Sequence, residues 1–197
     1  LHDVKDLFLD SDFKVFKDPA NDKKSKLVAM KLKKDISRGQ IDEYTKYVGN
    51  FGAKGLAYIK VNDVSDLKKG LQSPIVKFLS EKDKYSLVSD LKLNKGDIAF
   101  FMSGERKNIL SVLGNLRVFI AKSLDLINKN KFVPLWVIDF PLFEWDDENK
   151  RYSAMHHPFT APKEEDIKKL SSNPLKVKAN AYDLVLNGNE VGGGSIR

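Results

Sequence analysis

Residues 181–197 constrain the fold more than any other part of this chain. An Asn187-Gly188 dipeptide stands there between two alternating apolar runs, which is the strongest short-range signal for a two-residue β-hairpin turn. Three consecutive glycines, Gly192, Gly193 and Gly194, follow in the second run. Glycine weakens a strand interior and usually marks a place where another group approaches the backbone closely. The segment therefore predicts an antiparallel hairpin with a stretch free of side chains.

Glu190 and Arg197 flank these glycines with opposite charges. A carboxylate can hold a magnesium-bound phosphate, and a guanidinium group pairs with an anion. Arginine is scarce in the chain, so Arg197 beside a glycine stretch is a candidate anion-binding residue. The alternative is a surface ion pair between Glu190 and Arg197. Asp183 and Asn187 can equally be turn and strand-edge residues.

Composition limits the classes of protein to which the chain can belong. The chain has 197 residues and 22.3 kDa, enough for one core or two small ones. No apolar run reaches the roughly 18–20 residues of a membrane span, and the first residues do not resemble a signal peptide. Cysteine is absent, which excludes disulfides and favours the cytoplasm. The net charge of +7 comes from scattered lysines, so it only weakly supports a polyanionic partner.

Residues 1–127 alternate between strand and helix patterns, which predicts a compact α/β or α+β module. A capping box, Ser37 to Gln40, predicts the start of one helix, and Ser73-Pro74 predicts the start of another. The remaining expected elements are strands over 27–32, 55–61 and 98–102, a polar loop over 18–26, a helix over 82–91 with its apolar face on Tyr85, Val88 and Leu91, and a helix over 109–127.

Residues 128–197 are dominated by strand patterns, which predict part of an antiparallel sheet. The expected strands cover 135–140, 152–155, 182–186 and 190–197, with a short helix over 162–170. The strand over 135–140 is expected to be buried, with Asp139 and Glu144 as polar anchors at its end. A sheet this small is not expected to be stable by itself. Since the chain also lacks an initial Met, we expect it to be a piece of a longer protein.

Two of the three histidines are adjacent, His156 and His157, and precede Pro158. In an extended chain adjacent side chains point in opposite directions, so this pair is not expected to chelate one metal ion. Either ring can simply be a hydrogen-bonded structural histidine. A histidine that faces a substrate carboxylate would instead have its protonated form favoured, so at least one of the two is a candidate ligand-binding residue.

These motifs together resemble bacterial-type aspartyl-tRNA synthetase. The resemblance rests on Phe140-Pro141, on residues 155–163 (Met-His-His-Pro-Phe-Thr-Ala-Pro-Lys) and on the whole of residues 181–197. Residues 52–60, 73–78 and 96–101 are similar to the GAD-type domain inserted in that family. The resemblance covers essentially the whole chain and implies an α+β fold. Residues 1–127 would be the GAD-type insertion domain with its connection, and residues 128–197 part of the antiparallel sheet of a class II catalytic core.

The resemblance also implies a reaction and its participants. The family activates L-aspartate with ATP and transfers the aspartyl group to tRNA(Asp), as a cytoplasmic homodimer. By resemblance, His156 contacts aspartate, Arg197 clamps the aspartate side-chain carboxylate, and Glu190 binds ATP through Mg²⁺. The residues implied to support them are His157, Asp183, Gly192, Gly193, Gly194 and Ser195.

The first two class II motifs and the anticodon-binding barrel have no counterpart in this sequence. We therefore expect the isolated chain to be inactive. The alternative to a ligase segment is a non-catalytic module in which the GAD-type domain binds tRNA or a protein. A plain nucleic-acid-binding domain is disfavoured by the scattered lysines. The motifs do not show what the GAD-type domain does, or whether tRNA(Asn) is also a substrate of the longer protein.

Overall fold

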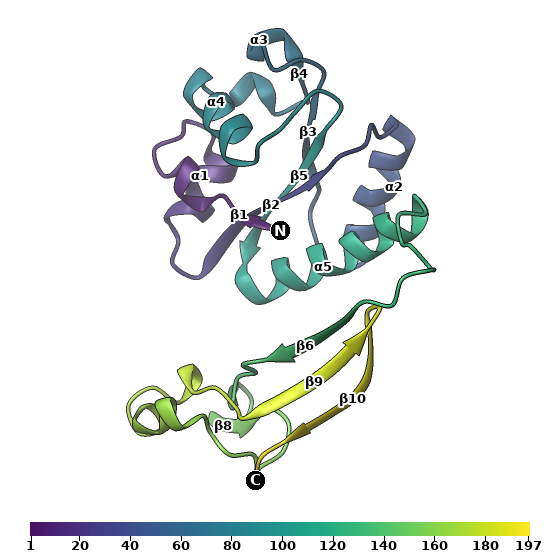
Figure 1. Ribbon diagram of the computed structural model, residues 1–197. Helices are drawn as coiled ribbons and strands as arrows, with labels where there is room; N and C mark the ends of the chain where they lie inside the picture. The colour runs from purple at the N-terminus through teal and green to yellow at the C-terminus, as the bar shows by residue number, and fades with distance from the viewer. The chain divides into compact units, whose positions relative to one another are not determined.

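The computed structural model describes residues 1–197 and consists of two compact units, Leu1–Ile127 and Asn128–Arg197 (Figure 1). The first unit has one sheet with a hydrophobic core on each face, and the second unit has two sheets and one small core. Helices and antiparallel sheets are both present, so the predicted α+β class is confirmed. None of the helices has the length and the apolar character that crossing a membrane requires.

The first unit is built on a five-stranded antiparallel sheet in the order β1-β2-β5-β3-β4. Its strands are β1 (His2–Asp3), β2 (Ser25–Leu32), β3 (Ala57–Val61), β4 (Leu71–Gln72) and β5 (Ile98–Glu105). Its α-helices are α1 (Lys14–Asn21), α2 (Arg38–Gly49), α3 (Leu67–Gly70), α4 (Glu81–Asp90) and α5 (Arg106–Ser123), and its 3₁₀ helices are η1 (Lys5–Phe8) and η2 (Val76–Phe78).

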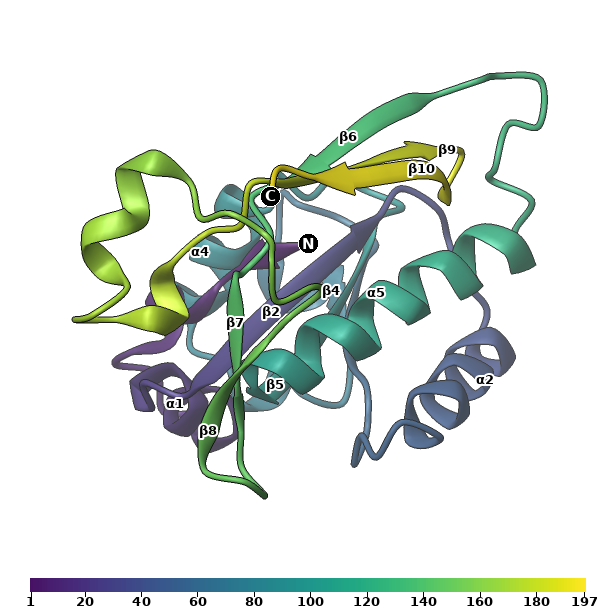
Figure 2. The ribbon, with the colours of Figure 1, turned by 90° about the horizontal axis from the view of Figure 1, so that it is seen from below.

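Side chains of the central strand β5 alternate between two cores, one on each face of the sheet. Ala99 and Phe101 belong to the core formed with η1, α1 and α4. Ile98, Phe100 and Met102 belong to the core formed with α2 and α5. Figure 2 shows α5 running across the sheet, where it contacts β2 and β5. A strand covered on both faces is continuously apolar, which explains the unbroken run at the start of β5.

Several sequence predictions for this unit are confirmed. Ser37 and Gln40 form the predicted capping box at the start of α2, with reciprocal side-chain-to-backbone hydrogen bonds. The three predicted strands are β2, β3 and β5, and the long predicted helix is α5. The helix ends at Ser123 rather than at Ile127, which is exposed.

Other predictions for this unit are wrong. The helix expected at Ser73-Pro74 is only the single 3₁₀ turn η2, because Leu79 is already extended and Ser80 caps α4. In α4, Tyr85 is 71% exposed instead of buried, and Leu87 takes its place in the core. The polar loop expected over 18–26 is partly helical, because α1 continues to Asn21 with Pro19 in its last turn.

The second unit contains two small antiparallel sheets rather than the single one expected. One has the order β10-β9-β6, and the other pairs β7 with β8. The elements are β6 (Pro134–Ile138), β7 (Phe143–Asp146), β8 (Arg151–Ala154), η3 (Glu164–Lys169), η4 (Pro174–Lys176), β9 (Ala181–Leu186) and β10 (Asn189–Ser195). β7 and η4 were not predicted, and the helix expected over 162–170 is the 3₁₀ helix η3.

The strand β6 is exposed, so the prediction of a buried strand over 135–140 is wrong. Trp136 and Ile138 are 60% and 58% exposed, on the face of the sheet where Trp136 meets the Tyr182 ring edge-on. The core of this unit is small and lies elsewhere, around Leu142, Val177 and Ala179. The second unit by itself supplies no α-helix to cover this face of the three-stranded sheet, so Trp136 and Ile138 are not buried within it.

Candidate active site

The terminal hairpin has the turn that its sequence predicts. Asn187 and Gly188 both adopt positive φ angles, 50° and 85°, between β9 and β10. This is the geometry of a type I′ turn, whose twist matches that of the flanking strands. The Asn187 side chain also accepts a hydrogen bond from the Val133 amide and donates one to the Lys131 carbonyl, both 2.8 Å long. Asn187 therefore shapes the turn and fastens it to the chain that enters β6.

A β-bulge at Val191 decides which way Glu190 faces. Asp183 pairs with Gly193 and Val185 pairs with Glu190, while Val191 has no partner. In a regular strand Glu190 and Gly193, three residues apart, would face opposite sides of the sheet. The extra residue of the bulge removes this difference, since directly opposed residues share a face. Asp183 and Glu190 therefore project from the same face of the hairpin.

The three glycines differ in their surroundings. A Cβ at Gly192 would meet nothing within 4 Å. A Cβ at Gly193 would lie 2.3 Å from Asp183 Oδ1, and one at Gly194 would lie 3.1 Å from the Tyr182 hydroxyl. Side chains of β9 thus occupy the space beside two of the glycines. The predicted close approach of another group is therefore present at Gly193 and Gly194, but the group comes from β9, so the stretch expected to be bare is bare only at Gly192.

Arg197 follows β10, and the backbone of the residue before it is fixed by a closed ring of three backbone hydrogen bonds. The Ala161 amide donates to the Ile196 carbonyl at 2.8 Å, the Ile196 amide to the Asn180 carbonyl at 2.9 Å, and the Asn180 amide to the Ala161 carbonyl at 2.8 Å. We call these three residues the backbone triangle. It joins three segments distant in sequence immediately before Arg197, so the position of Arg197 depends on all three.

A cavity of about 220 Å³ lies next to the triangle. It is lined by Phe140, His156, His157, Ala181, Asp183, Gly194, Ser195 and Arg197. The fold thus brings six of the sequence-predicted site residues together. Phe140 and Ala181 were not predicted as lining residues, although both stand inside the motifs that were singled out. The cavity has room for a small polar metabolite and contains one guanidinium, one carboxylate and two imidazoles.

Both histidines line the cavity, although an extended chain would have turned one away. The chain leaves β8 and bends at residues 155 and 156, which changes the directions of the two rings. His156 packs edge-on against the Phe140 ring, with centroids 5.0 Å apart. His157 Nδ1 accepts a hydrogen bond of 3.1 Å from the Phe159 amide. This bond requires an unprotonated Nδ1, so Nε2 carries the proton and is available as a donor.

Glu190, Gly192 and Gly193 do not line this cavity. Glu190 lies nearer the hairpin turn, diagonally across the two strands from Asp183. Nowhere in the chain do three or more side chains of the metal-binding types gather as a metal site would require. A magnesium ion here would have at most the two carboxylates as protein ligands and would take its other ligands from phosphate and water, as is usual for this ion.

Two comparisons show which known proteins this chain is similar to. The family model of the GAD domain matches residues 16–113. The aspartate–tRNA(Asp/Asn) ligase of Brachyspira hyodysenteriae (strain ATCC 49526 / WA1) is 50% identical over 199 aligned residues, which cover 100% of this chain. The chain spans 33% of the length of that relative. The resemblance is therefore confirmed: residues 16–113 match a GAD domain, and the whole chain matches about a third of an aspartate–tRNA(Asp/Asn) ligase.

Proposed function

We propose that this chain contributes the aspartate-binding part of the active site to a longer ligase, called here the parent enzyme. The parent enzyme would activate L-aspartate with ATP and transfer the aspartyl group to tRNA. The observation that supports this best is the convergence of Arg197, His156 and His157 on one small cavity. A cation and two imidazoles around a small cavity suit a ligand with a carboxylate, and the 50% identical relative is an aspartate–tRNA ligase.

Arg197 would bind the side-chain carboxylate of aspartate. Its guanidinium group matches a carboxylate with two parallel hydrogen bonds. Asparagine offers one acceptor and a donor that faces the donors of arginine, so the same contact disfavours it. His157, whose proton is held on Nε2, can donate a further hydrogen bond to an oxygen of the substrate. Selectivity for aspartate would then come from charge and donor geometry together.

Asp183 and Glu190 would hold Mg²⁺ with ATP. Both carboxylates project from one face of the hairpin because of the bulge at Val191. The residue opposite Asp183 is Gly193, so no side chain on β10 stands over this carboxylate. The residues present therefore fit the ion. When bound, magnesium would neutralise charge on the phosphates of ATP.

Activation would need no general base from this chain. The α-carboxylate of aspartate is already ionised at neutral pH. One of its oxygens would form a bond to the α-phosphorus of ATP, and the bond from that phosphorus to the leaving pyrophosphate oxygen would break. The residues described here would hold the reacting groups in position, which is a large source of rate in such reactions. In the second step a terminal ribose hydroxyl of tRNA would bond to the carbonyl carbon of the activated aspartate and lose its proton, and the bond from that carbon to the phosphate oxygen would break, which releases AMP.

The isolated 197-residue chain is expected to show no aspartate-dependent ATP–pyrophosphate exchange. His156, His157, Glu190 and Arg197 are all exposed, and the site lies beside a three-stranded sheet with an uncovered face. Fixed hydrogen-bond donors stabilise a transition state strongly only where water is excluded. Exchange by the isolated chain would contradict this part of the proposal.

The role of Glu190 can be tested in the parent enzyme by Glu190→Gln. We expect the KM for magnesium–ATP to rise at least tenfold while the KM for aspartate changes little, because the loss affects a ligand of the ion. Glu148→Gln is the matched control, since Glu148 is exposed in the β7–β8 turn. Equal kinetics for the two variants would remove Glu190 from the ATP site.

The alternative is a non-catalytic module in which the GAD domain binds tRNA or a protein. Such a module has no use for a carboxylate-binding cavity in the second unit. An unaltered parent protein that binds tRNA but shows no aspartate-dependent ATP–pyrophosphate exchange would favour this alternative over the ligase.

A further inference from the structure

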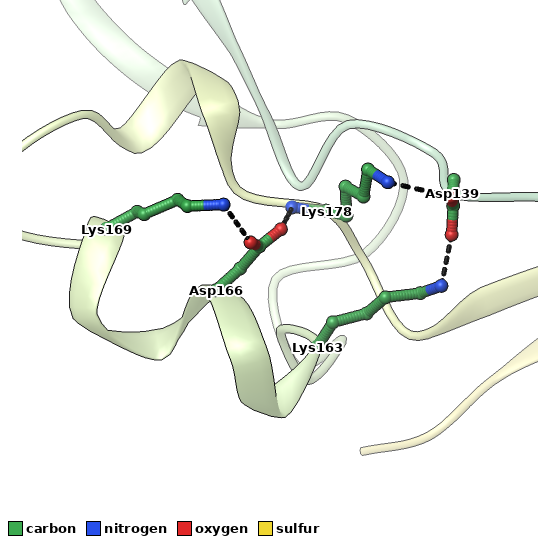
Figure 3. Close-up of polar contacts among 5 residues, drawn as sticks. All are labelled: Asp139, Lys163, Asp166, Lys169 and Lys178. Carbon is green, nitrogen blue, oxygen red and sulfur yellow. Dashed lines mark hydrogen bonds and ion pairs between the residues drawn. The ribbon is translucent and has the colours of Figure 1, made fainter.

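Asp139 stands where β6 ends and has an unusual backbone conformation. Its φ angle is +63°, in the left-handed region that Asp and Asn tolerate better than other residues with side chains. Its carboxylate forms ion pairs with two lysines, Lys163 and Lys178, the latter at 2.8 Å (Figure 3). Asp139 therefore joins the end of β6 to two segments that are 24 and 39 residues away in sequence.

The two lysines lie on segments that also form the backbone triangle. Lys163 follows Ala161 by two residues, and Lys178 precedes Asn180 by two. The Lys163 amide donates to the Lys178 carbonyl at 2.9 Å, which holds the two segments side by side. The carboxylate of Asp139 thus binds both segments just beyond the hydrogen bonds that fix Ile196 and, through it, Arg197.

A second aspartate, Asp166, also binds the Lys178 segment. Asp166 is almost fully buried, accepts a hydrogen bond of 2.9 Å from the Lys178 amide and pairs with Lys169 (Figure 3). Asp166 therefore fixes the backbone of Lys178, while Asp139 fixes its side chain. This leaves the Lys178 ammonium group in a defined place when the Asp139 carboxylate is present.

Asp139 is also connected, through the next residue, to a second wall of the cavity. The next residue, Phe140, lines the cavity and supports the His156 ring. The Phe140 carbonyl accepts a hydrogen bond of 2.7 Å from the Ala179 amide, one residue beyond Lys178. A shift at Asp139 would therefore move the support of His156 and the base of Arg197 together.

We propose that Asp139 is a positioning residue that sets the distance between Arg197 and His156 by clamping the Lys163 and Lys178 segments. Its meaning for catalysis rests on the proposed function, but the clamp itself does not. Asp139 touches neither the cavity nor a substrate group in this account. It acts through Phe140 on one wall and through the backbone triangle on the other.

The Asp139 carboxyl group is ionised at neutral pH and can form both ion pairs there. The hydrogen bonds and charges of Lys163 and Lys178 lower the pKa of its carboxyl group below the ordinary value of 3.8. Asp139→Asn therefore removes the charge at neutral pH while keeping the shape and the tolerance of a positive φ angle. The variant separates the ion pairs from the backbone conformation.

The clamp can be tested by amide hydrogen exchange of the 197-residue chain, followed by NMR. In Asp139→Asn we expect the protection of the Ala161, Asn180 and Ile196 amides to fall about tenfold, because local opening becomes easier. Asp35→Asn is the matched control, because Asp35 also forms an ion pair with a lysine, Lys60, but lies in the first unit. This control should leave the hydrogen-exchange protection of the Ala161, Asn180 and Ile196 amides unchanged.

Two results would overturn the clamp. One is unchanged protection at the three amides in Asp139→Asn. The other is an equal loss at every amide of the second unit, which would indicate general destabilisation rather than a local role. Lys163→Met and Lys178→Met should each reproduce part of the loss if the two ion pairs act together.

A kinetic measurement on the parent enzyme then tests positioning. Asp139→Asn should raise the KM for aspartate about tenfold and change the KM for ATP much less, since of the two proposed magnesium ligands Glu190 lies outside the cavity and only Asp183 lines it. Weaker hydrogen-exchange protection with unaltered aspartate kinetics would refute the positioning role. A wild-type parent enzyme without aspartate-dependent exchange would refute the proposed function, and the clamp would then be decided by hydrogen exchange alone.

Discussion

Asp183 and Gly193 lie directly opposite each other on β9 and β10, and the carboxylate of Asp183 fills the space that a side chain at position 193 would need. Asp183 Oδ1 is 2.3 Å from the place where a Cβ at residue 193 would stand. The neighbouring Gly192 has no such contact. The two glycines therefore have different reasons to lack side chains, and substitution separates them.

Gly193→Ala should displace the Asp183 carboxylate without unfolding the sheet. The Asp183 carboxylate has to move, and the Tyr182 carbonyl oxygen, 3.2 Å from the new Cβ, has to shift slightly. The free energy of unfolding should therefore change by about 1 kcal/mol. Misplacing a ligand of the phosphate-bound ion should still lower kcat of the parent enzyme roughly 10²-fold. Gly192→Ala is the control and should leave kcat almost unchanged. Equal kcat values for the two variants would show that the position of Asp183 does not matter for the reaction.

The ion pairs around Asp139 and Asp166 predict how stability depends on pH. Lys163 and Lys178 lower the pKa of Asp139, and Lys169 with the Lys178 amide lowers the pKa of Asp166. A carboxyl group whose pKa is lower in the folded than in the unfolded state stabilises the fold above the unfolded value of 3.8. This stabilisation is lost as the pH falls from about that value through the lower folded pKa values.

The two tryptophans make this loss measurable, because Trp136 and Trp145 both belong to the second unit. In urea titrations followed by tryptophan fluorescence, the midpoint should fall as the pH is lowered below about 4. In Asp139→Asn the midpoint at pH 7 should be lower and its dependence on acid weaker. An acid dependence as steep as that of the unaltered chain would show that Asp139 is not a source of it.

Lys178 should make the stability of the fold decrease as the pH rises, in the alkaline range. Asp139 raises the pKa of the Lys178 ammonium group above its ordinary value of 10.5. Its stabilising effect is complete below 10.5 and is lost as the pH rises through the higher folded pKa. The same fluorescence titration, continued above pH 10.5, should therefore show a second decrease of the midpoint, which Lys178→Met abolishes.

A core substitution in α5 should affect the first unit alone. Leu113 is fully buried between α5 and the sheet, so Leu113→Ala should cost about 2–5 kcal/mol of unfolding free energy. Leu110, on the same helix, is 39% exposed, and Leu110→Ala should change stability by less than about 1 kcal/mol. All α-helices lie in the first unit, so far-ultraviolet circular dichroism reports its unfolding. If Leu113→Ala lowered the unfolding midpoint measured by tryptophan fluorescence as much as the midpoint measured by circular dichroism, the prediction that only the first unit is destabilised would be wrong.

Local sequence signals predicted the features that depend on neighbours in the chain. The capping box of Ser37 with Gln40 and the Asn187-Gly188 turn each need only a few consecutive residues, and both are confirmed. The candidate site residues that stand within one motif, His156 and His157, both line the cavity; their role as ligand-binding residues stays a prediction.

Features that depend on pairing between distant segments were not predicted. The bulge at Val191 exists only relative to the register of β9, so no pattern within β10 reveals that Glu190 faces the same side as Asp183. The ion pairs of Asp139 join residues that the chain brings together only in three dimensions. Tyr85 was assigned to the core because helical spacing shows which residues share a face but not which of two adjacent faces is buried.

Arg197 is proposed to bind the side-chain carboxylate of aspartate, and Arg197→Lys in the parent enzyme is the sharpest test of this contact. Lysine keeps the charge but loses the paired hydrogen bonds, so kcat/KM for L-aspartate in ATP–pyrophosphate exchange should fall on the order of 100-fold, with the KM for ATP unchanged. Arg151→Lys, at an exposed arginine of β8, is the matched control and should be neutral. An Arg197→Lys enzyme with the aspartate kinetics of the Arg151→Lys control would contradict the account.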